Sequence, residues 1–132
     1  MASDVEDLVG LRILVVEDTL LVADLMRDCL ESFGCTVVGP VAGVQAALDL
    51  ADSESLDGAL LDVNLAGEFS FPVATALGAR NVPVVFLTGY GDAATFPREF
   101  QSMPRIAKPF RYNNLADVLS QQFGKTRRQP IS

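Results

Sequence analysis

Residues 12 to 18 read RILVVED, and this stretch decides the fold, because a short apolar run ends abruptly in two acids. The β-branched run Arg12–Val16 has the composition of a buried strand. Thr19–Phe33 follows as an amphipathic helix, with Thr19 as a plausible N-cap and Gly34 as the stop. The apolar residues spaced four apart in that helix are Leu21, Leu25, Cys29 and Phe33.

The same alternation of strand and helix continues along the chain. Further strands are expected at Thr36–Val41, Ala59–Val63, Val84–Leu87 and Arg105–Ala107. Further helices are expected over Val44–Ala51, over Phe71–Arg80 with Ser70 as cap, and after Asn113 with Leu115, Val118, Leu119 and Phe123 inward until Gly124. Strands separated by single helices form a parallel sheet covered on both faces. We therefore predict an α/β, doubly wound, flavodoxin-like fold with strand order 2-1-3-4-5.

Length and composition indicate one folded domain. The chain has 132 residues, of which 49% are hydrophobic and 20% charged. We expect an N-terminal extension at 1–9, the domain at 10–124 and a C-terminal tail at 125–132. Cys29 and Cys35 fit reduced buried thiols better than a disulfide or zinc site, which suggests a cytoplasmic location. No apolar run approaches the roughly 18 residues of a membrane span.

Charge and the missing residue types exclude several functions. The net charge of −7 disfavours binding to nucleic acid and to anionic membranes. The sequence contains no histidine, so histidine-based acid–base catalysis, metal ligation and phosphotransfer within this chain are excluded.

A polar side chain stands at the carboxyl end of almost every predicted strand, where open parallel sheets bind ligands. These residues are Glu17-Asp18, Asp62, Thr88 and Lys108-Pro109. Clustered carboxylates without histidine or thiolate suit a hard cation such as Mg²⁺. A lysine and a threonine opposite them suit phosphoryl oxygens.

Each of these residues also has an ordinary structural interpretation. Glu17-Asp18 could be first-turn helix acids and Asp62 a loop cap. Thr88 could be an ordinary strand residue and Lys108 a solvated charge. Their joint placement, each at the end of its own strand, favours a functional site.

These residues, in this order and spacing, resemble the response-regulator receiver domain over about residues 10–124. The resemblance implies that Asp62 is the phosphoacceptor for a sensor histidine kinase or a histidine phosphotransfer protein. It implies that Asp18, Asp62 and the backbone carbonyl of Asn64 hold Mg²⁺, with Glu17 acting mainly through water. Lys108 and Thr88 would bind phosphoryl oxygens, and the Lys108-Pro109 peptide would be cis. Such a protein signals and is not an enzyme in the ordinary sense.

Two alternatives stay open. One is an aspartyl-phosphate phosphohydrolase of the haloacid-dehalogenase type, although Asp62-Val63-Asn64 lacks the second acid of its Asp-x-Asp motif. The other is a receiver-like binding module that is never phosphorylated. The second alternative is disfavoured because all of the expected site residues are present.

The segment after the fourth strand departs from an ordinary receiver. Pro97 and Pro104 interrupt it, so a short or irregular fourth helix is expected, confined to about Asp92–Phe96 or Arg98–Ser102. Arg105 stands where receivers carry the aromatic residue that switches. Together with Gly89, Tyr90 and Pro109, it marks the expected phosphoryl-binding and switch region.

The matching residues Pro83, Phe86, Thr88, Gly89 and Tyr90 resemble the signature of stand-alone bacterial receivers called FATGUY, while Val84 and Leu87 depart from it. That resemblance implies a phosphodonor kinase of the HWE type or a relative. Both a downstream protein partner and a phosphate-sink role are compatible with it.

Overall fold

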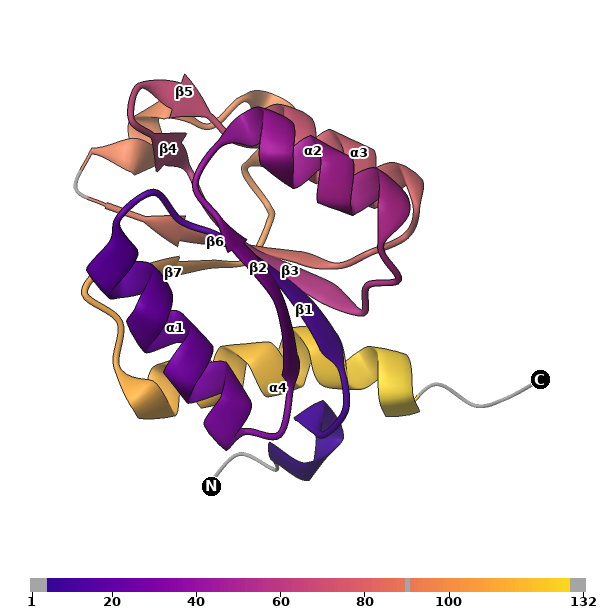
Figure 1. The fold of residues 1–132 in the computed structure, drawn as a ribbon. Helices are drawn as coiled ribbons and strands as arrows, with labels where there is room; N and C mark the ends of the chain where they lie inside the picture. The colour runs from indigo at the N-terminus through magenta and orange to yellow at the C-terminus, as the bar shows by residue number, and fades with distance from the viewer. Residues whose placement is uncertain (1–4, 90, 129–132) are drawn as a thin grey trace.

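The architecture is a parallel sheet between two layers of helices, seen in a computed structural model that describes residues 5–89 and 91–128 (Figure 1). Within these residues the sheet has five strands in the order β2-β1-β3-β6-β7. They are β1 (Arg12–Val16), β2 (Thr36–Val41), β3 (Gly58–Asp62), β6 (Val84–Thr88) and β7 (Arg105–Ala107). Counted along this sheet alone, the order is 2-1-3-4-5, so the predicted doubly wound α/β class is confirmed.

Helices cover both faces of the sheet (Figure 1). On one face lie α1 (Leu20–Ser32) and α4 (Tyr112–Arg128), and on the other lie α2 (Val44–Ser53) and α3 (Phe71–Ala79). The residues of β3 and β6 are all buried, because helices cover both of their faces. No helix in the described ranges combines the length and apolarity needed to cross a bilayer.

The inward face of α1 differs from the predicted one. Leu21 and Leu25 are 79% and 52% exposed, while Ala23, Met26 and Leu30 are buried. The predicted stripe was wrong for the two leucines because a spacing of four drifts around a helix that turns every 3.6 residues. The prediction was correct for the other two residues of the stripe, because Cys29 and Phe33 are buried. Both cysteines are free and buried, as expected.

Several predicted helix ends were also wrong. Asn113 does not cap the last helix, which begins at Tyr112, and Gly124 does not stop it, since the helix continues to Arg128. Thr19 and Ser70 do occupy the N-cap positions of α1 and α3, but neither side chain makes a capping hydrogen bond. Packing of an apolar face outweighs a single weak helix former such as glycine.

The first described residues belong to the core. A 3-10 turn, η1 (Val5–Leu8), lies against α4, and Leu8 is fully buried. The Leu8 carbonyl accepts a hydrogen bond from the Cys35 thiol at 3.4 Å. Part of the region expected as an extension therefore contributes to packing.

The segment between β6 and β7 replaces a regular helix by two 3-10 turns, η2 (Asp92–Thr95) and η3 (Arg98–Phe100). The predicted short or irregular fourth helix is therefore confirmed. Phe96 is buried between these turns and contacts the rings of Phe71 and Phe86. The Phe100 ring stacks on Phe71, with 5.2 Å between centroids. Aromatic packing therefore holds the segment against the core.

Two further features were not predicted. A small antiparallel hairpin, β4 (Asn64–Leu65) and β5 (Glu68–Phe69), follows β3. At the sheet edge, the pairing of β2 with β1 shifts register between Leu14 and Val16, beside a cis Gly39-Pro40 peptide.

Candidate functional site

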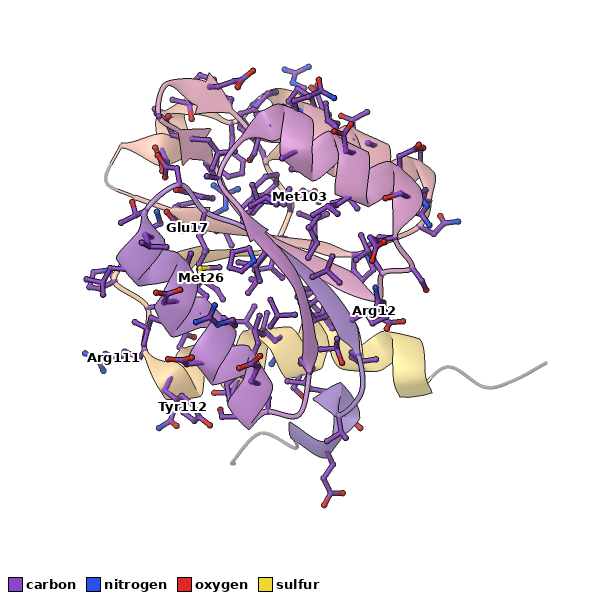
Figure 2. All side chains as sticks on the ribbon, viewed as in Figure 1. Arg12, Glu17, Met26, Met103, Arg111 and Tyr112 are labelled. Carbon is purple, nitrogen blue, oxygen red and sulfur yellow. The ribbon has the colours of Figure 1, made fainter. Side chains whose placement is uncertain are left out.

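The carboxyl ends of four neighbouring strands meet at one rim of the sheet. Asp62 pairs in register with Leu87, and the Lys108 amide donates a 2.8 Å hydrogen bond to the Thr88 carbonyl. Glu17 follows β1 directly, at the opposite end of that strand from Arg12 (Figure 2). Parallel pairing thus brings together side chains that are 91 positions apart in sequence, from Glu17 to Lys108.

Lys108 joins two buried carboxylates at this rim. Its Nζ lies 2.9 Å from Asp62 Oδ2 and 3.2 Å from Glu17 Oε2. Asp62 is 3% and Glu17 is 2% exposed, so both acids are largely removed from water. A shared ammonium offsets the repulsion between the two carboxylates, which burial would otherwise make costly.

The pKa values at this cluster follow from burial and charge. The pKa of Asp62 is raised to about 7, chiefly because burial disfavours the carboxylate; the charge of Glu17 also raises it, while the hydrogen bond and charge of Lys108 oppose the rise. Burial alone would lower the pKa of Lys108, but the two carboxylates outweigh it and that pKa is raised. When no further cation is near, the pKa of Asp62 therefore lies close to neutrality, well above the ordinary value of a carboxyl group.

The three acids also form an oxygen-ligand cluster. One carboxylate oxygen from each of Glu17, Asp18 and Asp62 lies within 4.8 Å of the others. Glu17 Oε1 accepts the Thr19 amide at 3.0 Å, whereas Glu17 Oε2 accepts no hydrogen bond from the described residues, although the ammonium is near. A buried carboxylate oxygen with unused capacity beside two further carboxylates fits Mg²⁺, which takes few protein oxygens and keeps its own waters.

Opposite the acids lie a hydroxyl and a backbone amide. Thr88 is 8% exposed, and among the described residues its hydroxyl makes one long contact, 3.5 Å to the Ile106 carbonyl. A hydrogen bond of that length is weak, so the hydroxyl remains available for a better acceptor. The Gly89 amide donates to Asp92 Oδ2 at 2.6 Å. Asp92 was not singled out in the sequence, and only the turn-forming Gly-x-Gly-Asp run that precedes it could have indicated this contact.

The other predicted residues are spread around the rim. Asn64 begins β4, and its side-chain oxygen accepts the Gly67 amide at 2.7 Å. The Lys108-Pro109 peptide is cis, as expected. The guanidinium of Arg105 lies over the ring of Phe96. Arg105 therefore packs with the aromatic side chains of the segment between β6 and β7. Tyr90, predicted as part of the switch region, lies outside the described residues.

An apolar pocket adjoins the rim. It has a volume of about 360 Å³ and is lined by Val22, Leu25, Gly89, Lys108, Pro109 and Phe110. The exposed Leu21 belongs to the same helix as Val22 and Leu25. The helix that borders the site therefore exposes three leucines, Leu20, Leu21 and Leu25.

The family model for the response regulator receiver domain matches residues 13–120. Among curated proteins, the phyllosphere-induced regulator PhyR of Methylorubrum extorquens is 31% identical over 113 residues, which cover 83% of this chain and 42% of PhyR. The chain spans about half the length of the curated relatives it matches.

Two solved structures extend the likeness over nearly their whole length. SdrG from Sphingomonas melonis Fr1 is 41% identical with a TM-score of 0.75, and the match covers 86% of this chain and 95% of SdrG. The receiver domain of the sensor histidine kinase PA1611 from Pseudomonas aeruginosa PAO1 is 28% identical with a TM-score of 0.75, covering 87% of this chain and 98% of that one. That receiver was solved with a magnesium ion coordinated in its active-site cleft.

Proposed function

This chain belongs to the response-regulator receiver family of two-component signalling systems, and from that premise we propose that it accepts a phosphoryl group on Asp62 from the phosphohistidine of a partner protein. The observation that carries the proposal is the position of Asp62, which is buried at the end of β3 with its Oδ2 2.9 Å from the Lys108 ammonium. The family assignment also replaces the haloacid-dehalogenase alternative, because that alternative requires a different set of motifs.

The transfer itself is a displacement at phosphorus. One Asp62 carboxylate oxygen attacks the phosphorus atom, the phosphorus–nitrogen bond breaks, and the imidazole nitrogen leaves with the bonding pair and takes up a proton. The product is an acyl phosphate on Asp62. Because little covalent chemistry is required of the protein, positioning and charge stabilisation supply most of the catalysis.

The chain's own residues have distinct roles in this step. The charge and hydrogen bond of Lys108 favour the carboxylate form of Asp62 against the burial that raises its pKa. Its ammonium is close enough to pair with a phosphoryl oxygen once the acyl phosphate forms. The Thr88 hydroxyl, which makes only a long contact, would rotate toward a second oxygen. Gly89 offers a backbone amide next to it. When bound by Asp18, Asp62 and the carbonyl of Asn64, with Glu17 acting through water, Mg²⁺ supplies positive charge for the oxygens of the transferring group.

The phosphodonor would be a sensor histidine kinase or a histidine phosphotransfer protein. The apolar pocket contains Leu25 of α1 and Phe110 in its lining together with Lys108, whose ammonium contacts Asp62. This surface, with the exposed Leu21 on the same helix, suits a helical partner that carries the phosphohistidine. The resemblance of the sequence of residues 83–90 to the FATGUY signature supports a kinase of the HWE type or a relative. A cytoplasmic protein that binds a further partner, or drains phosphate from the kinase, is the biological setting we propose.

Phosphotransfer is tested by incubating the protein with labelled acetyl phosphate and Mg²⁺. The wild type should take up one label in an acid-stable, base-labile bond, and Asp62→Asn should take up none. Asp24→Asn serves as the matched control, because Asp24 is an acid of α1 that pairs with Arg27 at 3.3 Å outside the cluster. Continued label on Asp62→Asn would place the acceptor elsewhere. Steady release of inorganic phosphate over many turnovers would indicate a hydrolase instead.

A further inference from the structure

The first turn after β6 is closed by a reciprocal pair of hydrogen bonds between Gly89 and Asp92. The Gly89 amide donates to the Asp92 carboxylate oxygen Oδ2 at 2.6 Å, and the Asp92 amide donates to the Gly89 carbonyl at 3.2 Å. Gly91 adopts a left-handed conformation with φ of 84°, which lets the chain turn within this short distance. A donor–acceptor distance of 2.6 Å to an anionic acceptor marks a strong, charge-assisted bond.

Gly89 lies near the residues that we propose bind the phosphoryl group. Gly89 directly follows Thr88, the last residue of β6, and lines one pocket together with Lys108, whose ammonium contacts Asp62. On the proposed function, on which this inference rests, an oxygen of the phosphoryl group on Asp62 needs a donor here. The Gly89 amide has a single hydrogen, and the Asp92 carboxylate already holds it.

We propose that Asp92 is an internal competitor of the phosphoryl group: its carboxylate occupies the Gly89 amide in the free protein and must leave when Asp62 is phosphorylated. Asp92 would then act as a positioning residue, through Gly89, and not by contact with the donor. The exchange conserves hydrogen bonds, since the amide trades one anionic acceptor for another. The released carboxylate turns toward water, away from the like charge of the phosphoryl group.

The competition has two consequences. It lowers the affinity of the site for a phosphoryl group, because each binding event must break the existing bond of Asp92. The competition also couples phosphorylation of Asp62 to η2, because the Asp92 side chain closes the turn from which that 3-10 helix begins. The state of Asp62 is thereby connected to the segment that leads to Phe96.

A purely structural role for Asp92 makes a different prediction. If its carboxylate only closed the turn, its removal would loosen the Gly89 backbone and weaken the binding of a phosphoryl mimic. If it competes, the same removal frees a donor and strengthens binding. The sign of the change therefore separates the two roles.

The experiment measures the binding of beryllofluoride, with saturating Mg²⁺, to ¹⁵N-labelled protein by amide resonances. Asp92→Ala should bind beryllofluoride roughly tenfold more tightly than the wild type, because no charge-assisted bond has to be broken. Asp92→Asn keeps a neutral acceptor and should fall between the two. Glu99→Ala is the matched control: it removes one negative charge from the same segment without removing the acceptor of the Gly89 amide, so its affinity should stay near the wild-type value.

The Gly89 amide resonance supplies a readout that affinity alone does not. It should move upfield in free Asp92→Ala, where the strong bond is lost, and move downfield again with beryllofluoride. An unchanged or weaker affinity in both Asp92 variants, or a Gly89 resonance that is the same in Asp92→Ala and the wild type, would overturn the proposal. If Asp92→Ala does not fold, Asp92→Asn decides the question by the same two measurements.

Phosphorylation of Asp62 is tested separately in the same proteins with acetyl phosphate. If the wild type is labelled on Asp62 but the Asp92 variants bind the mimic no more tightly, the competition is wrong and the proposed function stands. If neither beryllofluoride nor acetyl phosphate reacts with the wild type, the proposed function itself is wrong.

Discussion

The guanidinium carbon of Arg105 lies 4.0 Å from the centroid of the Phe96 ring. Arg105 starts β7, and Phe96 lies between the two 3-10 turns that precede this strand, so the contact fastens the irregular segment to the edge of the sheet. Its guanidinium also donates to the Gln101 carbonyl at 2.5 Å. The position where receivers carry a switching aromatic thus holds a cation that packs on an aromatic from elsewhere in the same segment.

We expect Arg105→Ala to lower the free energy of unfolding by about 1 kcal/mol, through loss of this cation–π contact and of the bond to Gln101. In a Phe96→Leu background the same change should cost less, because the ring is already absent. Urea denaturation of the two single variants and the double variant measures the coupling. Arg98→Ala, an exposed arginine of η3, is the control and should stay within about 0.5 kcal/mol of the wild type.

Mg²⁺ should stabilise the fold, because it relieves repulsion among Glu17, Asp18 and Asp62. At ten times its dissociation constant the gain is about 1.4 kcal/mol. For a domain of this size that corresponds to a rise in melting temperature on the order of 5 °C. Thermal unfolding after treatment with EDTA, with and without added Mg²⁺, tests this. Equal melting temperatures in the two samples would show that the cluster binds no Mg²⁺.

The pKa of Asp62 predicts a pH dependence of the metal-free protein. Its folded-state pKa of about 7 lies above the ordinary value of 3.8, so between these two pH values the folded state keeps a proton that the unfolded state loses. This contribution is fully present below about pH 4 and is lost as pH rises through about 7. In EDTA, the wild type should therefore lose more stability between pH 5 and about pH 8 than Asp62→Asn does. Parallel curves for the two proteins would contradict the raised pKa.

Gly58 should be intolerant of a side chain. A Cβ there would lie 2.6 Å from Cδ1 of Phe123, which is fully buried against the sheet. We expect Gly58→Ala to destabilise the protein by roughly 1–3 kcal/mol through overpacking. Gly78→Ala is the matched control, because nothing lies within 4 Å of its Cβ position and it occupies a helix. That variant should be up to about 1 kcal/mol more stable than the wild type. A neutral Gly58→Ala in chemical denaturation would mean that α4 shifts freely over β3.

The segment between residues 91 and 105 should become more ordered on activation. Its 3-10 turns are held by short-range hydrogen bonds of poorer geometry than those of an α-helix, so their amides should exchange quickly in the free protein, apart from those near Phe96 and Phe100. Mg²⁺ with beryllofluoride should slow the exchange of residues 91–95 in particular, because the phosphoryl mimic would take over the Gly89 amide from Asp92 and anchor the start of the segment to the rim. Hydrogen exchange by mass spectrometry measures this. Protection that changes only outside the segment would rule out its role in signalling.

Sequence reasoning located the site better than it located the edges of the elements. Asp62, Thr88 and Lys108 could be placed together because the carboxyl ends of parallel strands share one rim, whatever the exact helix lengths are. The two prolines likewise sufficed to predict an irregular fourth helix. These inferences depend on topology and on proline chemistry, which a single sequence displays directly.

The features that were predicted wrongly or missed depend on packing and contacts in the folded chain, which a single sequence does not display. Leu21 and Leu25 fit a helical period, yet the sheet takes the neighbouring face through Met26 and Leu30. Gly124 is a weak helix former, but Phe123 beside it is fully buried and keeps the helix on the sheet. Asp92 matters only because a left-handed glycine folds its carboxylate back onto Gly89, a contact that no periodic pattern reveals.

The two edge strands of the sheet affect how readily the protein aggregates at high concentration. Strand β7 has only three residues, and β2 carries a proline and a register shift where a neighbouring chain would need a regular row of donors. Neither border offers a long, flat template for intermolecular strand pairing. The exposed apolar groups of α1 are therefore side chains on a helix, whereas neither edge strand of the sheet favours pairing with the backbone of another molecule.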